Sequence, residues 1–311
     1  MPFRWTKPSL RGAIGLALLA QVSVNSGSGF AVRAFEVAGP AAMVLLRNGL
    51  GAIILLAVIR PRLRGVPRRA WAAVGCYGLA LVVMNSFFYE AIGRLPVGPA
   101  VTVEMTGPLV LSVILSRRLR GWLWAAMAAG GVALISGFDV AQMNLAGTGL
   151  ALCAGAAWAC YILCARWVGK AFSSADGLAL GMAVSALLAV PRGVVDLAVR
   201  PWTPAILGWG VLVALLATAI PYGMEMLALR GMPAAVFSVM TSVAPATAAL
   251  AGWVIAGQSL TGWVLGGMAL VAAASAGAAL TERGDRRRAR AQAAAAVVAE
   301  VADAGQDGDV G

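Results

Sequence analysis

Long apolar stretches separated by a few polar residues dominate the pattern along this 311-residue chain. A helix that crosses a bilayer needs about 20 predominantly apolar residues, and ten stretches reach that length. The loops that remain between them are too short to hold a soluble catalytic or nucleotide-binding domain. We therefore predict an all-α integral membrane protein with ten transmembrane helices. They are expected at residues 12–31, 40–59, 70–92, 97–115, 121–138, 147–166, 176–195, 205–229, 233–256 and 260–280.

The second half of the chain repeats features of the first half. The best-matched segments are residues 90–96 and 227–233, and each ends in a proline that begins a predicted span. A further proline, Pro108 or Pro245, follows twelve residues later in each copy. A weaker match joins the glycine pair 130–131 to the pair 266–267.

The repeat divides the chain into two five-helix units, at residues 12–138 and 147–281. Because five is an odd number of crossings, the two units must lie in opposite orientations, as in many secondary transporters. Residues 1–11 are expected to form a cytoplasmic N-terminus. The basic, then Ala-rich and acidic segment 282–311 is expected to be a disordered cytoplasmic tail.

Charge refines the topology of this prediction. Only 12% of residues are charged, against about 25% in soluble domains, although the net charge is +11. A basic balance of this size in a soluble protein would suggest nucleic acid. Here the arginines gather in alternate loops, which the positive-inside rule assigns to the cytoplasm, so we expect no nucleic-acid partner. Both termini are then cytoplasmic, and twenty-two arginines against two lysines suit a bacterial inner membrane.

Several kinds of chemistry are disfavoured by residues that the chain lacks. It has no histidine, and its four cysteines form no CxxC pair, so no metal site is expected. The GxxxxGK[ST] motif, which binds the phosphates of ATP, does not occur in the chain. We therefore expect no ATP-driven step that depends on such a motif. We expect neither an enzyme nor a cofactor.

Two opposite charges lie at the same predicted depth in the membrane. Arg47 is seven residues into the second span and Glu104 seven residues into the fourth. Both spans run from outside to inside, so each charge lies about 10 Å deep. Charges at such depth are costly and are kept for pairing or for function. One interpretation is a structural ion pair; the other is a site where Glu104 binds a proton or an amine and Arg47 faces a carboxylate.

Pro108 and Pro245 lie inside spans, where proline removes a backbone donor and frees the carbonyl four residues earlier. Those earlier residues are Glu104 and Thr241. A freed carbonyl in a membrane must find a partner or face a wet cavity. We therefore predict broken helices that line a site at both positions, with a simple packing kink as the alternative.

Other polar and aromatic residues complete the predicted site. Glu90 and Glu225 lie near opposite ends of corresponding spans and are interpreted as marking the two mouths of one pathway, or as interfacial side chains that reach water. The further candidates for substrate or proton binding are Asn85, Tyr89, Trp158, Tyr161, Tyr222 and Thr241.

The chain resembles the drug/metabolite transporter superfamily, in particular proteins with paired EamA domains, over residues 12–281. Within it the chain is most similar to bacterial threonine/homoserine exporters. The resemblance rests on Glu-x-Thr-Gly-Pro at 104–108, on Pro-Tyr-x-x-Glu-Met at 221–226, and on the segments 84–89 and 156–163. It implies efflux of small amino acids driven by proton entry with alternating access. Glu90 departs from the pattern, which has an uncharged residue there.

Two alternatives remain open at this stage. A broad drug exporter of the same superfamily would have a more apolar aromatic cavity. A non-transporting membrane scaffold would fill its pocket with side chains and use Arg47 and Glu104 only structurally. The expected partners are an amino-acid substrate, protons and the bilayer, and the protein is expected to be a monomer or a homodimer.

Overall fold

The structure, a computed structural model, describes residues 8–61, 63, 66–116, 119–136, 144–281, 284 and 292, and no strand occurs among them. Predictions for residues 1–7 and for all other positions of the tail lie outside these residues. The helices are α1 (Leu10–Ala38), α2 (Pro40–Ile59), α3 (Arg68–Ile92), α4 (Val97–Glu104), α5 (Thr106–Ser116), α6 (Leu119–Ser136), α7 (Leu145–Val168), α8 (Ser174–Ala198), α9 (Pro204–Ala214), the π-helical turn η1 (Leu215–Ala219), α10 (Ile220–Gly231), α11 (Ala234–Thr241), α12 (Ala244–Ala256) and a last helix, Gly262–Thr281.

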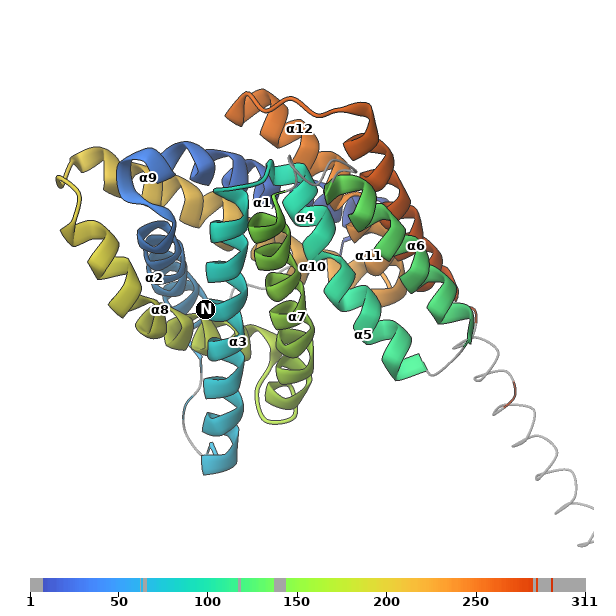
Figure 1. The fold of residues 1–311 in the computed structure, drawn as a ribbon. Coiled ribbons are helices and arrows are strands. Elements are labelled where there is room, and N and C mark those ends of the chain that lie inside the picture. The colour runs from blue at the N-terminus through green and yellow to red at the C-terminus, as the bar shows by residue number, and fades with distance from the viewer. Residues whose placement is uncertain are drawn as a thin grey trace, which may run out of the picture.

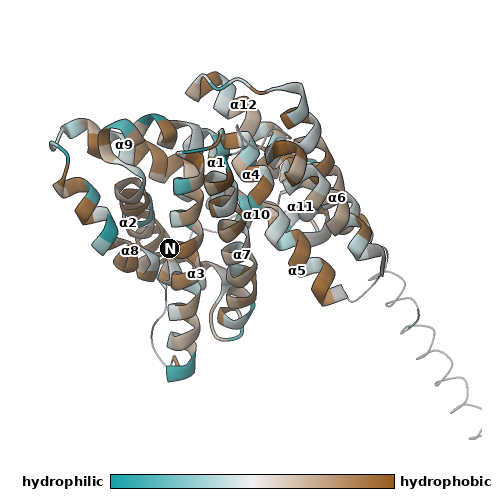
Figure 2. Cartoon of the chain, in the orientation of Figure 1, coloured by the Kyte–Doolittle hydropathy of each residue, from teal (hydrophilic) through white to brown (hydrophobic). Residues whose placement is uncertain are grey.

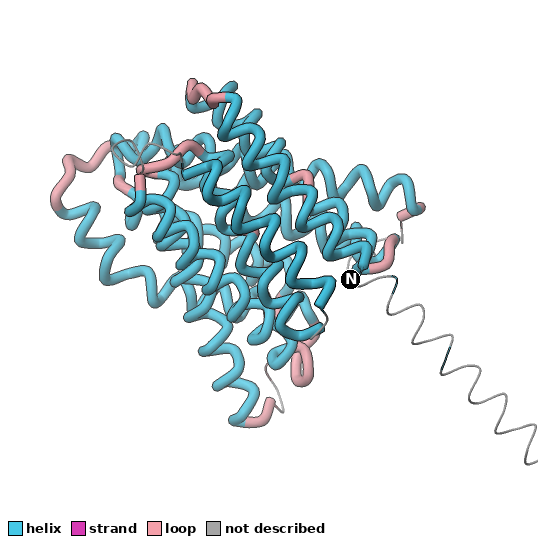
Figure 3. The backbone as a smooth tube through the Cα atoms, turned by 45° about the vertical axis from the view of Figure 1, so that its right-hand side comes forward, coloured by secondary structure: helices cyan, strands magenta, loops and turns pink. Residues whose placement is uncertain are grey.

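The all-α membrane fold is confirmed. Eight of the described helical segments are long and apolar enough to cross a membrane, including the compound spans Val97–Leu115 and Pro204–Gly231. Two shorter apolar helices, Gly121–Ile135 and Ala244–Ala256, lie at the predicted fifth and ninth spans. The helices run beside one another with their connecting loops gathered at the ends (Figure 3). Hydrophobic residues cover most of their length, and hydrophilic ones lie largely near the ends (Figure 2).

One predicted boundary is wrong by about two turns. The first span was expected to end at residue 31, but α1 continues to Ala38. Arg33 and Glu36 make these last turns polar, which hides them from a hydropathy pattern, yet Arg33 Nε donates to the carbonyl of Ile255 in α12. The helix ends at Gly39, whose φ of +81° favours glycine. A β-carbon there would also collide with the guanidinium of Arg200.

Each contact between a helix of one half of the chain and a helix of the other half has a counterpart in which the roles of the two halves are reversed. The third span, α3, packs along the sixth, α7, and the eighth span (α9, η1 and α10) packs along the first, α1 (Figure 1). In the same way α4 and α5 pack on α7, while α11 and α12 pack on α1. The pairs α2–α8 and α4–α12 join equivalent spans to each other. An approximate two-fold relation between the halves accounts for each of these pairings.

A reciprocal glycine contact follows the same relation. A β-carbon added to Gly131 would lie 2.7 Å from the carbonyl oxygen of Gly267, and one added to Gly267 would lie 2.6 Å from that of Gly131. Helix α6 and the helix Gly262–Thr281 therefore touch backbone to backbone through two glycines. These are members of the glycine pairs that match between the halves in sequence.

The spans that contain Pro108 and Pro245 are both interrupted. Helix α4 ends at Glu104 and α5 begins at Thr106, while α11 ends at Thr241 and α12 begins at Ala244. In both spans the first helix ends at the residue four positions before the proline, where the proline ring displaces the carbonyl. The same step of the fold is therefore built twice, once in each half.

Candidate functional site

Arg47 lies on α2 and is 5% exposed. Its Nε donates to Thr218 Oγ1 at 3.1 Å, and its Nη2 donates to the carbonyl of Ala217 at 3.0 Å. Both acceptors belong to η1, and single π-helical turns within α-helices are frequent at functional sites because they alter the local backbone hydrogen bonding. The turn thus holds a cation from the first half of the chain with neutral groups from the second half.

Tyr89 on α3 covers one side of this cation. The Arg47 Cζ lies 5.4 Å from the centre of the Tyr89 ring, within the range of a cation–π interaction. The Tyr89 side chain is fully buried, and it interacts with the neighbouring Arg47 guanidinium.

Glu104 terminates α4 and is 8% exposed. Its charge interacts through space with that of Arg47, but the ion pairs among the described residues do not include one between these two side chains. The sequence placed the two charges at one depth, and the structure brings them near each other without joining them. Arg47 takes its hydrogen bonds from η1 instead, so the Glu104 carboxylate is left to another partner.

Two glycines allow the backbone at the break after Glu104 to pack closely against α7. A β-carbon added to Gly155 on α7 would lie 2.5 Å from the carbonyl oxygen of Glu104, and one added to Gly107 would collide with the carbonyl of Gly155. The freed carbonyl of Glu104 therefore packs directly on the backbone of α7. Thr241 holds the equivalent place in the second half, where it is half-buried at the end of α11.

Asn85 belongs to a buried polar network. Its Nδ2 donates to Asn48 Oδ1 at 3.1 Å, and Asn48 Nδ2 donates to Ser185 Oγ at 2.8 Å. The three side chains are at most 2% exposed and tie α2, α3 and α8 together. Sequence analysis expected Asn85 to bind substrate or a proton, whereas the structure gives its amide a partner within the protein.

A cavity of about 190 Å³ lies between α3, α7, α8 and α10. Tyr161, Tyr222 and Glu225, all predicted site residues, line it together with Tyr77, which sequence analysis did not single out. The lining also includes Gly169 and Gly177, on either side of the α7–α8 turn, so the cavity lies at the predicted cytoplasmic end. Trp158 does not line it and packs instead against the main apolar core.

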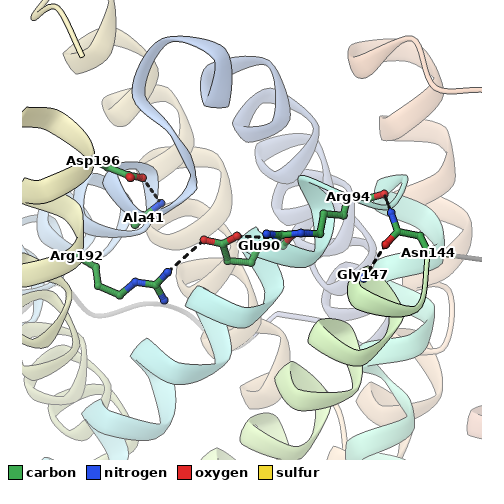
Figure 4. Close-up of polar contacts among 7 residues, drawn as sticks. All are labelled: Ala41, Glu90, Arg94, Asn144, Gly147, Arg192 and Asp196. Atoms are coloured by element: carbon green, nitrogen blue, oxygen red, sulfur yellow. Dashed lines mark hydrogen bonds and ion pairs between the residues drawn. The ribbon is translucent and has the colours of Figure 1, made fainter. Parts of the chain in front are cut away.

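The opposite end of the bundle is tied by charged side chains (Figure 4). Glu90 on α3 contacts Arg94 at 2.7 Å and reaches Arg192 on α8 at 3.4 Å. Asp196 on α8 accepts hydrogen bonds from the backbone N–H groups of residues 41 and 42 at the start of α2, at 3.0 and 3.4 Å. Glu90 therefore has ionic partners at this end, whereas Glu225 faces the cavity at the other.

Several of these residues were missed because they are ordinary in sequence. Thr218, Asn48, Ser185 and Tyr77 lie in apolar stretches without charge, and a single hydroxyl or amide there does not differ from packing residues. Thr218 is part of the segment that precedes Pro221, so its position beside a helix-breaking proline was the one available signal.

Known proteins show strong similarity to this chain. Residues 145–280 match the EamA-like transporter family. The chain is 38% identical over 269 residues to the threonine/homoserine exporter RhtA of Salmonella typhimurium, covering 86% of this chain and 90% of that protein. It is 36% identical over 273 residues to RhtA of Escherichia coli K12, covering 87% and 92%.

A solved crystal structure has the same fold, with a TM-score of 0.57 and 18% identity over 86% of this chain and 99% of its own. The chain therefore belongs to the EamA-like transporter family of the drug/metabolite transporter superfamily, and it is a multi-pass inner-membrane transporter rather than an enzyme.

Proposed function

We propose that this protein exports small amino acids of the threonine and homoserine type from the cytoplasm, in exchange for protons. The observation that carries the proposal is the pair of buried, opposite and unjoined charges, Arg47 and Glu104. A zwitterion presents the complementary pair, a carboxylate and an ammonium. The alignments with the relatives named as threonine/homoserine exporters cover 90% and 92% of those proteins, which supports the same substrate class.

Arg47 is the proposed carboxylate site. A guanidinium carries five N–H donors in a planar fork that suits a carboxylate. The contacts to Thr218 and Ala217 engage Nε and Nη2, and Nη1 is the proposed contact for the carboxylate of the substrate. Because η1 fixes the plane of the fork, the orientation of the bound carboxylate would be set by span eight.

Glu104 is the proposed site of exchange. Its carboxylate pairs either with the ammonium of the substrate or with a proton, and the two compete for the same oxygen atoms. Arrival of a proton would therefore release the ammonium, and arrival of the substrate would displace the proton. This competition couples the two fluxes without a further titrating group in the site.

Alternating access follows from the two five-helix units, 12–138 and 147–281, rocking about the shared site. In the present conformation the cavity lies at the α7–α8 end, while ion pairs join α3 to α8 at the opposite end. With both termini cytoplasmic, as the positive-inside rule predicts, this is an inward-facing arrangement that would take its substrate from the cytoplasm.

A broad drug exporter is the second candidate. Pockets for drug-sized ligands enclose about 300–1,000 Å³, whereas the cavity at the α7–α8 end encloses about 190 Å³. A drug that used this route would therefore require the cavity to widen.

Uptake of labelled threonine into inside-out vesicles, with a pH-sensitive dye inside, tests the proposal. An outwardly directed proton gradient should drive uptake, and threonine addition should alkalinise the lumen. Homoserine should compete, and lipophilic cations should not. Uptake inhibited by lipophilic cations but not by homoserine would favour the drug exporter instead, and gradient-independent uptake would remove the proton from the mechanism.

A further inference from the structure

Three tyrosines surround one carboxylate in the cavity at the α7–α8 end. Tyr77 and Tyr161 stack with their ring centres 4.9 Å apart and their planes at 23°. Tyr222 and Glu225, from span eight, line the same space. The rings come from three different spans, so the arrangement exists only in the folded protein.

The Glu225 carboxylate is left without a cationic partner. Among the residues that line the cavity, all in the described part of the chain, Glu225 is the one charged side chain. Glu225 forms no ion pair with another described residue, whereas Glu90 contacts two arginines. An unpaired carboxylate beside a cavity of this size has room for a small cation.

Aromatic rings beside a carboxylate form a chemical environment that binds organic ammonium groups. The negative faces of tyrosine rings attract a cation, and the carboxylate accepts its hydrogen bonds with the added strength of a charged pair. No guanidinium lines this cavity, so it offers no charged partner for a carboxylate. The chemistry of the lining therefore selects for the amine and against the acid.

Span eight connects this cavity to the site around Arg47. Tyr222 and Glu225 are three residues apart on α10, which places them on one helix face, and Thr218 lies in the turn η1 directly before that helix. At about 1.5 Å per residue, Glu225 lies about 10 Å along the span from Thr218. Tyr222 lies between them, on the same helix as Glu225 and in the lining of the same cavity.

We propose that the Tyr77–Tyr161–Tyr222–Glu225 cavity is a separate entry site, which binds the primary ammonium of a small molecule before its carboxylate reaches Arg47. The identity of the cargo as an amino acid rests on the proposed function. The ammonium selectivity of the cavity does not, because it rests on the lining alone.

The test uses the purified full chain in detergent and three probes, with affinity measured by calorimetry. The probes are threonine, 1-aminopropan-2-ol, which keeps the ammonium and lacks the carboxylate, and N-acetylthreonine, which keeps the carboxylate and lacks the ammonium. We expect the amino alcohol to bind. Glu225→Gln should weaken its binding by about 10–100-fold, the worth of a charged hydrogen bond, while Glu90→Gln, at the opposite end of the bundle, should leave it unchanged.

The tyrosines supply a second measurement that is independent of the carboxylate. Tyr161→Phe keeps the ring and should bind the amino alcohol as the natural protein does, whereas Tyr161→Leu should bind it several-fold more weakly. A gel-filtration profile like that of the unaltered chain shows that each variant is folded. Equal affinity of the unaltered chain and the Glu225→Gln variant for the amino alcohol would overturn the proposal, as would N-acetylthreonine binding that is weakened by Glu225→Gln as much as the binding of the amino alcohol.

The same experiment separates this proposal from the transport function. If the amino alcohol binds through Glu225 but vesicles do not take up threonine, the entry site stands and the proposed cargo is wrong. If vesicles take up threonine while the amino alcohol binds equally well to the Glu225→Gln variant, the transport function stands and the entry site is wrong.

Discussion

The two broken spans share a backbone design and differ in their chemistry. At the first break the carbonyl of Glu104 packs on Gly155, so two backbones meet without an intervening side chain. At the second break the Asn25 amide on α1 donates to the carbonyl of Ala244 at 3.4 Å and to Thr247 Oγ1 at 2.8 Å. One break carries a carboxylate and a glycine crossing, and the other carries a threonine and an amide.

This difference shows how a repeated fold can contain a single site. Repetition supplies two helix breaks that face each other through α4 and α12, which builds symmetry into the backbone. The two charges of the proposed exchange site, Arg47 and Glu104, however, both come from the first half. The second half supplies the neutral groups of η1 that hold the arginine. Function therefore depends on the sequence differences between the two halves.

The largest difference is expected between the two residues that end α4 and α11. Glu104→Gln removes the proposed exchange group while preserving shape, so proton-driven threonine uptake into vesicles should fall by at least about 100-fold. Thr241→Val, at the equivalent position, should retain uptake within about 3-fold, because no proton transfer is assigned to it. Equal losses in the two variants, at equal protein levels, would show that the breaks act alike.

The glycine crossing at the first break should tolerate no side chain. Gly107→Ala places a β-carbon against the carbonyl of Gly155, and we expect a destabilisation of about 1–3 kcal/mol from overpacking. Gly149→Ala, on the same helix as Gly155 but with no atom within 4 Å of the added carbon, should be neutral or stabilising by up to about 1 kcal/mol. Thermal unfolding in detergent, followed by size-exclusion chromatography, measures both. A Gly107→Ala variant as stable as the Gly149→Ala control would mean that the crossing is looser than described.

The amide at the second break should matter less. Asn25→Ala removes the amide's bonds to the carbonyls of Gln21 and Ala244 and to Thr247 Oγ1. The carbonyl of Ala244 keeps its bond from the Thr247 hydroxyl at 3.0 Å, so the only bond across the break that is lost without a substitute is the one to Thr247 Oγ1. The expected cost is about 0.5–1.5 kcal/mol, the net worth of that hydrogen bond. Thermal unfolding should place this variant between the natural protein and Gly107→Ala. A larger loss than that of Gly107→Ala would reverse the assigned roles of the two breaks.

The smallest effect is expected at the end of the bundle opposite the cavity, where Glu90 of the first half reaches Arg192 of the second. Both side chains are partly exposed, at 22% and 70%, and such pairs contribute about 0–1 kcal/mol. Arg192→Ala should therefore lower the unfolding midpoint slightly at low salt and not at high salt, where screening removes the interaction. Arg94→Ala, which removes the contacts of Glu90 with the turn after α3 and leaves the pair with Arg192, is the matched control. A salt-independent loss in Arg192→Ala would indicate packing rather than charge.

The sequence predicted features that depend on local composition. Each span is recognisable because a membrane crossing must be apolar over its whole length. Pro108 and Pro245 indicated where α4 and α11 end because proline acts on the carbonyl four residues earlier in its own chain. Arg47 and Glu104 were recognised as unusual because a charge in an apolar stretch is costly whatever surrounds it.

Only the tertiary structure decided which side chains meet. Arg47 donates to Thr218, which lies far from it in sequence. Tyr77 on α3 stacks on Tyr161 on α7. Hydropathy does not fix these partners, since a spanning helix is apolar on every side and its pattern does not show which face turns inward. The rotation of each helix is set instead by close packing, at contacts such as Gly107 against Gly155 and Gly131 against Gly267. Composition therefore determined that the chain crosses the membrane with charges inside it, and helix packing determined that Arg47 is held by η1 while the Glu104 carboxylate stays unpaired.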